Sequence, residues 1–236
     1  MRRAYRNIGY YFLAILAVIL IGYYASYLRG VPASNGVSGF AHLYFVAFLL
    51  WFALLIIQPF LIKQKRPELH RKLGKSSYLI VPILVITAHE MQRIGYYAHL
   101  AELPEEQRLG ALLNTYLDLF FFVLFYMMAM FYKADISRHI CFMVGTSLVL
   151  LGPGLGLLLS QVIRNGAMAE MVAFAVQQAI IILFVVYEKR KVRKDIWKSP
   201  WILLFGLMLL KAGLYFGLPE TSVWQSVAGL IVRWLY

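Results

Sequence analysis

Charged residues are scarce in this sequence, and acidic residues are the scarcest of them. Asp, Glu, Lys and Arg together make up 14% of the 236 residues, whereas about a quarter is usual for soluble domains. Hydrophobic residues make up 61% of the chain, and the mean hydropathy is +0.70. Because so few polar side chains cannot cover a water-facing surface, the composition excludes an ordinary soluble protein and predicts an integral membrane protein.

Cysteine is nearly absent, since Cys141 is the only one. A single cysteine excludes an intramolecular disulfide, and we expect Cys141 to be an apolar residue within a span. The sequence also lacks a P-loop, a nucleophile motif, a metalloprotease motif and a soluble catalytic domain. It therefore favours a non-enzymatic protein in which residues 1–236 form a single transmembrane domain.

Seven apolar runs are long enough to cross a bilayer, whose hydrocarbon core of about 30 Å requires roughly 20 residues of helix. Loops rich in Gly, Pro, Asn and charged residues separate these runs, and the basic segment 63–75 is one of them. Residues 221–236 carry apolar side chains at near-helical spacing and are predicted to be an amphipathic helix on the outer face. The predicted fold is thus an all-α transmembrane bundle of seven helices. The predicted spans are about 9–28, 40–62, 77–99, 111–132, 139–162, 168–187 and 200–218.

The distribution of basic residues predicts the orientation of the bundle. With the N-terminus inside, 17 of the 23 lysine and arginine residues fall in cytoplasmic segments and only four in outer ones. This bias is typical of a multi-pass protein of a bacterial inner (plasma) membrane. The basic loops are expected to meet anionic lipid headgroups. The formal net charge of +12 is therefore explained without nucleic acid, for which the sequence has no suitable soluble module.

Several ionisable residues lie within the predicted spans, where an unpaired charge costs at least about 2.5–3.5 kcal/mol. At 1.5 Å per residue of helix, they share one slab between the centre and the outer half of the bilayer. We therefore expect a single polar cluster that binds a small polar or anionic ligand or relays protons. Residues that only pair with one another to fix helix packing are the alternative. The candidate residues are His89, Glu90, Arg93, Asp118 and Lys211, and the nearby Gln177 and Gln178 are expected to be helix–helix contacts.

The other four histidines lie near the ends of the predicted spans. His42 and His99 are at the outer edge, and His70 and His139 are at the inner edge. Two histidines at one level on neighbouring helices are the arrangement that a bis-imidazole haem or a metal site requires. A b-type haem or metal-binding redox protein is therefore an alternative hypothesis, beside interfacial histidines without a ligand.

A set of motifs resembles a group of functionally uncharacterised bacterial membrane proteins. These proteins have a His-led second span with Trp and Gln, an inner loop with H-R-x-L-G, and a later H-x-x-x-M segment. The resemblance covers about a third of the chain and implies an integral membrane protein without implying an activity. Phe40 departs from the pattern, since the group often has a second histidine there. The matching residues are His42, Trp51, Gln58, His70, Arg71, Leu73, Gly74, His139, Met143 and Pro153.

Overall fold

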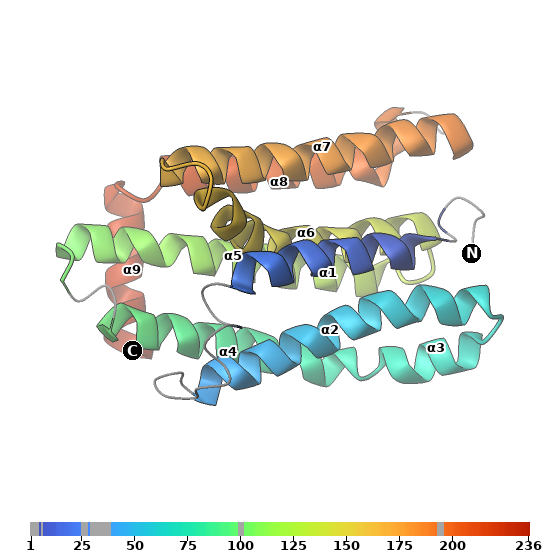
Figure 1. Cartoon of the computed structure of the whole chain (residues 1–236), viewed down its shortest axis with the longest axis horizontal. Coiled ribbons are helices and arrows are strands. Elements are labelled where there is room, and N and C mark those ends of the chain that lie inside the picture. Colours follow the sequence, from blue (N-terminus) through green and yellow to red (C-terminus); the bar gives the residue numbers. More distant parts are fainter. Residues whose placement is uncertain (1–4, 6, 25–27, 29–38, 99–101, 193–195) are drawn as a thin grey trace.

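The computed structural model describes residues 5, 7–24, 28, 39–98, 102–192 and 196–236, and the described chain is helical without strands. Seven long helices run along the molecule, and short helices lie at its two ends (Figure 1). The helices are α1 (Ile8–Tyr23), α2 (Gly39–Lys63), α3 (Pro67–Gly74), α4 (Ser77–Ala98), α5 (Glu105–Phe131), α6 (Ile136–Ser160), α7 (Gly166–Val192), η4 (Ile196–Lys198), α8 (Pro200–Gly217) and α9 (Ser222–Leu235).

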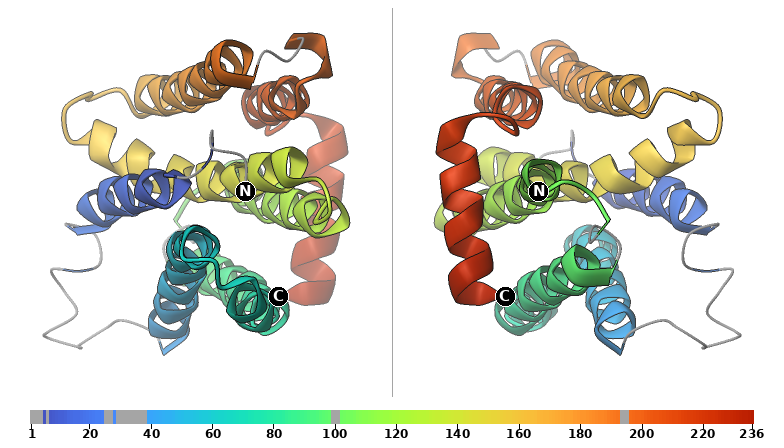
Figure 2. Two further views of the ribbon diagram at one scale, coloured as in Figure 1. Left: turned by 90° about the vertical axis from the view of Figure 1, so that its right-hand side faces the viewer. Right: turned by 90° about the vertical axis from the view of Figure 1, so that its left-hand side faces the viewer.

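The long helices form three layers, which are visible when the bundle is viewed along its axis (Figure 2). α7 and α8 form one outer layer, α1, α6 and α5 form the middle layer, and α2 and α4 form the other outer layer. α9 crosses one end of the bundle and packs against α5. α3 and η4 lie at the opposite end, which also holds the start of α1. Following the orientation predicted from the sequence, we call this opposite end the inner end and the end with α9 the outer end.

Five helices are long and apolar enough to cross a membrane, namely α2, α5, α6, α7 and α8. α1 is apolar but has 16 residues. α4 has 22 residues, but His89, Glu90, Gln92 and Arg93 lower its hydropathy. The chain therefore has the composition of a membrane protein, and five of the seven predicted spans satisfy both conditions.

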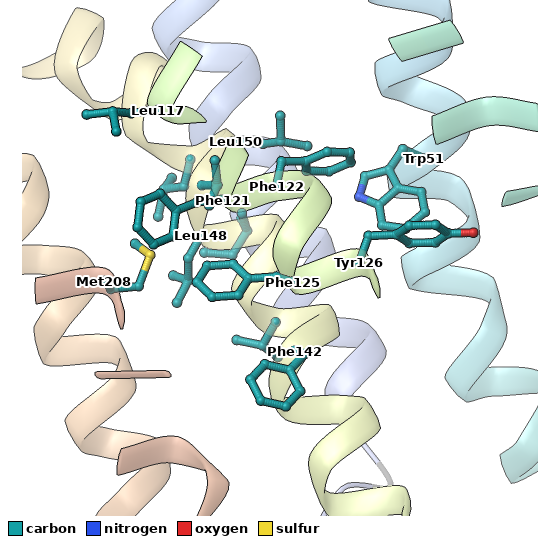
Figure 3. Packing of buried hydrophobic residues seen from close by; sticks show 14 of the residues in the cluster. Trp51, Leu117, Phe121, Phe122, Phe125, Tyr126, Phe142, Leu148, Leu150 and Met208 are labelled. Atoms are coloured by element: carbon teal, nitrogen blue, oxygen red, sulfur yellow. The ribbon is translucent and has the colours of Figure 1, made fainter. Parts of the chain in front are cut away.

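Small residues on α6 allow the middle layer to pack closely. A Cβ atom added to Gly22 of α1 would collide with the backbone oxygen of Gly154, so the two helix backbones are in direct contact. Such close approach through small residues is a common way for membrane helices to associate. Aromatic side chains of α5 fill the remaining core, and Figure 3 shows Phe122 and Tyr126 beside Trp51 of α2.

The basic segment 63–75 is not simply a loop, because it contains helix α3. Pro67 starts this helix, Glu68 lies in its first turn, and Arg71 and Lys72 lie in its last turn. This order of charges suits the helix dipole, and proline is favourable at a helix start. Lys65 makes the sharp corner before α3 with a left-handed backbone at φ 60°. The prediction of a loop over residues 63–75 was therefore wrong for Pro67–Gly74, because the charges and the proline, which are common in loops, also suit a short helix in this order.

The C-terminal helix predicted for residues 221–236 is present as α9. The Thr221 side chain caps its first turn, and Trp224 and Ala228 are its buried residues. The Trp224 indole donates a hydrogen bond to the backbone oxygen of Leu109 at 2.8 Å. This contact holds α9 against α5 at the outer end of the bundle.

Candidate functional site

An ion pair between α5 and α8 lies at the centre of the candidate site. The Lys211 Nζ atom is 2.8 Å from the Asp118 Oδ1 atom. Lys211 is only 2% exposed, and its ammonium also lies 4.7 Å from the centre of the Phe174 ring of α7. Two of the predicted site residues are therefore brought together, with both charges compensated.

A second carboxylate, Glu170 of α7, belongs to the same group. Glu170 interacts electrostatically with both Asp118 and Lys211. Its carboxylate fits against Gly156 of α6, where an added Cβ atom would collide with the Glu170 Oε1 atom. Tyr215 of α8 also interacts electrostatically with both carboxylates. We call Asp118, Glu170 and Lys211 the outer triad.

Polar contacts extend the outer triad towards other helices. The Asn114 amide of α5 donates a hydrogen bond to the Tyr215 hydroxyl at 3.2 Å. The hydroxyls of Tyr23 in α1 and Tyr44 in α2 interact electrostatically with Asp118. Residues of α1, α2, α5, α7 and α8 thus contribute to one polar region.

Glu90 and Arg93 do not join this region through any contact among the described residues. They pair with each other along α4, with the Arg93 Nη2 atom 2.8 Å from the Glu90 Oε2 atom. Their side chains are 21% and 36% exposed, respectively. The expected single cluster is therefore divided, because two oppositely charged residues three positions apart can satisfy each other on one helix face.

His89 lies in a third group, which links α4, α5 and α9. The Tyr116 hydroxyl is 3.0 Å from the His89 Nδ1 atom and donates a hydrogen bond to the Tyr236 hydroxyl at 3.3 Å. The His89 and Tyr236 rings are also in edge-to-face contact, with centroids 5.6 Å apart. His89 therefore helps to hold the C-terminal helix against the bundle.

A buried carboxylate at the inner end was missed by the sequence analysis. Glu188 of α7 is 1% exposed. Its Oε1 atom accepts hydrogen bonds from Ser137 at 2.7 Å and from Tyr5 at 3.1 Å, and its Oε2 atom accepts one from Ser199. Burial raises the pKa of Tyr5 to about 12, so this hydroxyl stays protonated and can donate. Trp201 in turn donates from its indole to the Tyr5 oxygen at 3.3 Å.

Helical periodicity was the sequence signal that could have revealed Glu188. It follows Glu170 by 18 residues, which is five full turns of α-helix, and therefore lies on the same face of α7. The predicted span ended at residue 187, because Glu188 is followed directly by a run of basic residues. Those neighbours made it look like part of a charged loop.

Gln177 lies on this same face of α7 between the two glutamates. It is 1% exposed, and neither of its amide atoms has a hydrogen-bond partner in the described part of the chain. A Cβ atom added to Gly152 of α6 would lie 2.9 Å from the Gln177 Nε2 atom. Gln177 therefore lies at a contact between α7 and α6, as expected, and Gln178 also has buried amide atoms without a hydrogen-bond partner in the described residues.

The inner pair of histidines lies at a cavity of about 520 Å³ between α1, α2, α3, α4 and α6. Both His70 and His139 line it, and the two rings interact electrostatically. Burial lowers the pKa of His70, and the Arg71 charge adds to this effect. Of the outer pair, His42 is half-buried in α2, whereas His99 lies outside the described residues.

Within the described residues, no three His, Cys, Asp or Glu side chains are grouped so that they could hold a metal ion. Cys141 is fully buried. No protein family, curated protein or solved structure matches the chain, and the resemblance suggested by the motifs stays a prediction.

Proposed function

We propose that this chain is a seven-span protein of a bacterial inner membrane that relays protons along α7. The observation that carries the proposal is the polar face of this helix, on which the half-buried Glu170 and the buried Gln177 and Glu188 lie in line. At 1.5 Å per residue, Glu170 and Glu188 are separated by about 27 Å along the helix axis, close to the roughly 30 Å of a hydrocarbon core.

The net charge of the outer triad favours the binding of a proton. It combines two carboxylates with one ammonium, so the three ionised groups carry an excess negative charge in a region of low dielectric. A proton on one carboxylate removes that excess and keeps the Lys211–Asp118 ion pair intact. Because Glu170 lies in the first turns of α7 and is half-buried, it is the member of the triad closest to the outer surface.

Further polar groups lie along α7 between the outer triad and the inner end. Gln177 has an amide that is free to bind water, which buried amides require when protein offers no partner. Nearer the inner end, the Tyr11 and Ser147 hydroxyls are 3.5 Å apart, and the Tyr11 ring packs against Phe184 of α7. Glu188 then provides a carboxylate surrounded by hydroxyl donors.

Proton flux into liposomes tests the proposal. The purified protein is reconstituted with a pH-sensitive dye inside, and a potassium diffusion potential drives uptake. We expect flux above that of empty liposomes, and at least a tenfold decrease for Glu170→Gln, Gln177→Leu or Glu188→Gln. Glu105→Gln is the matched control, since this exposed carboxylate at the outer end lies off the line.

Thermal unfolding of each variant separates transport from packing. Wild-type protein that is folded but gives no more flux than empty liposomes would contradict the relay. If the α7 variants then lowered only the melting temperature, the polar face would be a packing device. Equal flux through the wild type and all three variants would also overturn the proposal.

A further inference from the structure

The inner cavity has the size and the lining of a cofactor site. It is separate from the proposed path of protons along α7. Its volume of about 520 Å³ lies in the range of roughly 300–1,000 Å³ typical of ligand and cofactor pockets. Most of its surface is apolar and comes from helices that meet at the inner end. Phe12, Trp51, Leu55, Ile140 and Met143 are among its lining residues.

His139 is held so that one nitrogen remains for a ligand. Its Nδ1 atom is 2.8 Å from the backbone oxygen of Ala129. This contact fixes the ring and selects the tautomer with hydrogen on Nδ1, which leaves the Nε2 lone pair unprotonated. Histidines that ligate metals characteristically donate their other ring N–H in this way.

His70 is held from α2 through the same ring atom. Its Nδ1 atom lies 3.4 Å from the backbone oxygen of Gln58. In the orientation that satisfies its neighbours, the Gln58 amide nitrogen donates a hydrogen bond to the His70 Nδ1 atom, and the amide oxygen accepts one from the Gly74 backbone N–H at 3.1 Å. That amide contact places the His70 hydrogen on Nε2, so ligation of iron requires the Gln58 amide to turn away and the hydrogen to move to Nδ1, where the Gln58 backbone oxygen accepts it. The lowered pKa of His70 favours the neutral ring that a metal requires.

Two imidazoles are too few for a bare metal ion but suffice for an iron porphyrin. Zinc sites normally have at least three protein ligands, and the described residues offer no group of three candidate ligands. A porphyrin supplies four nitrogens of its own, so two axial histidines complete six-coordinate iron. A lipid chain would use the apolar walls but neither imidazole.

Arginine and lysine side chains at the edge of the cavity suit the carboxylates of an iron porphyrin. Arg71 and Lys75 line it near His70, and Lys133 lines it near His139. Guanidinium and ammonium groups pair well with carboxylates, and haem carries two propionates. We propose that this cavity binds a b-type haem between His70 and His139, with its propionates directed towards Arg71, Lys75 or Lys133. Attachment is non-covalent, because no cysteine lines the cavity.

Absorption spectroscopy of protein purified from haem-supplied cells tests this site. We expect about one haem per chain, with the low-spin spectrum and electron paramagnetic resonance signal of bis-imidazole iron. His70→Ala and His139→Ala should each lower haem content at least tenfold. His89→Gln is the matched control, because this histidine contacts Tyr116 and Tyr236 instead of the cavity, and it should retain haem.

Two further measurements keep the proposal testable if an alanine variant folds poorly. External imidazole should restore the low-spin spectrum of His139→Gly. Gln58→Leu should retain haem or bind it more tightly, because it removes the amide that holds the His70 hydrogen on Nε2. Folded wild-type protein that acquires no Soret band, even when titrated with haemin, would overturn the proposal. So would a Soret band that persists in both histidine variants, or a lipid identified in the cavity in place of haem.

Discussion

Lys211 and Glu188 are buried to a similar extent, but different kinds of neighbours compensate for their burial. Lys211 has an opposite charge, Asp118, at 2.8 Å and an aromatic ring beside it. Glu188 accepts hydrogen bonds from three hydroxyl groups. The first arrangement is sensitive to loss of either charge, whereas the second depends on several neutral donors.

Removal of one charge from the outer triad is expected to destabilise the fold more than removal of two. Lys211→Met leaves the half-buried Asp118 carboxylate within the bundle without its ammonium, and loss of one partner from an ion pair inside a protein typically costs about 3–5 kcal/mol. The double variant Lys211→Met with Asp118→Leu removes both charges and should recover much of that loss. Reversible unfolding in mixed detergent measures both. A double variant as unstable as the sum of its single variants would show that the ion pair is not coupled.

Loss of the Tyr5 hydroxyl is expected to weaken the inner end. Tyr5→Phe keeps the ring but deprives Glu188 of a donor and the Trp201 indole of an acceptor, at a cost of about 1–3 kcal/mol. Tyr10→Phe is the control, because Tyr10 is 55% exposed and makes only ring contacts in the described structure. Equal melting temperatures for the two variants would contradict this account.

At the scale of helices, α6 is the element on which the middle layer depends. It packs against α1, α5 and α7, and its glycines let different partners approach. Gly154 faces the backbone of α1, Gly152 faces Gln177, and Gly156 faces Glu170. The same short stretch therefore sets the spacing of helices and the position of the polar face of α7.

A methyl group at Gly22 is expected to separate α1 from α6. Gly22→Ala places its Cβ atom against the Gly154 backbone oxygen, and backbone cannot move aside as a flexible side chain can. We expect a loss of at least 1–3 kcal/mol, the usual range for overpacking. Gly206→Ala in α8 meets nothing within 4 Å and should be neutral or stabilising, by up to about 1 kcal/mol from helix propensity. Similar unfolding midpoints for the two variants would contradict the direct backbone contact.

The apolar runs were sufficient to predict the long helices, because lipid leaves a spanning chain few alternatives to helix. The pairing of side chains was less predictable. Asp118 and Lys211 do meet, but Glu90 found its partner on its own helix. Depth along the bilayer follows from residue number, whereas the direction of a side chain depends on how each helix is rotated within the bundle. Glu188 was missed because its basic neighbours concealed its place on the α7 face.

At the scale of the whole molecule, the two ends of the bundle differ in chemistry. α3 and η4 lie at the inner end, and α9 crosses the outer end (Figure 1). α3 carries arginine and lysine in its last turn, whereas α9 is largely apolar with a single arginine. The orientation predicted from the sequence places the basic end in the cytoplasm.

Labelling of single cysteines in intact cells tests that orientation. Cys141→Ala provides a cysteine-free background, into which Glu68→Cys of α3 or Ser226→Cys of α9 is introduced at an exposed position. A membrane-impermeant maleimide should label Ser226→Cys in intact cells and Glu68→Cys only after permeabilisation. The background variant alone should stay unlabelled. The reverse pattern of labelling would show that the topology is inverted. Labelling of both positions in intact cells would contradict an odd number of spans between them.

The hydrogen bond between Tyr5 and Trp201 joins residues 196 positions apart, and Ser199 contacts Glu188 beside it. During translation, the ribosome adds Tyr5 long before these two partners exist. Chains that stop short of α8 therefore leave Glu188 without Ser199 and Tyr5 without the indole. The inner end of the bundle therefore cannot be completed before α8 has been synthesised.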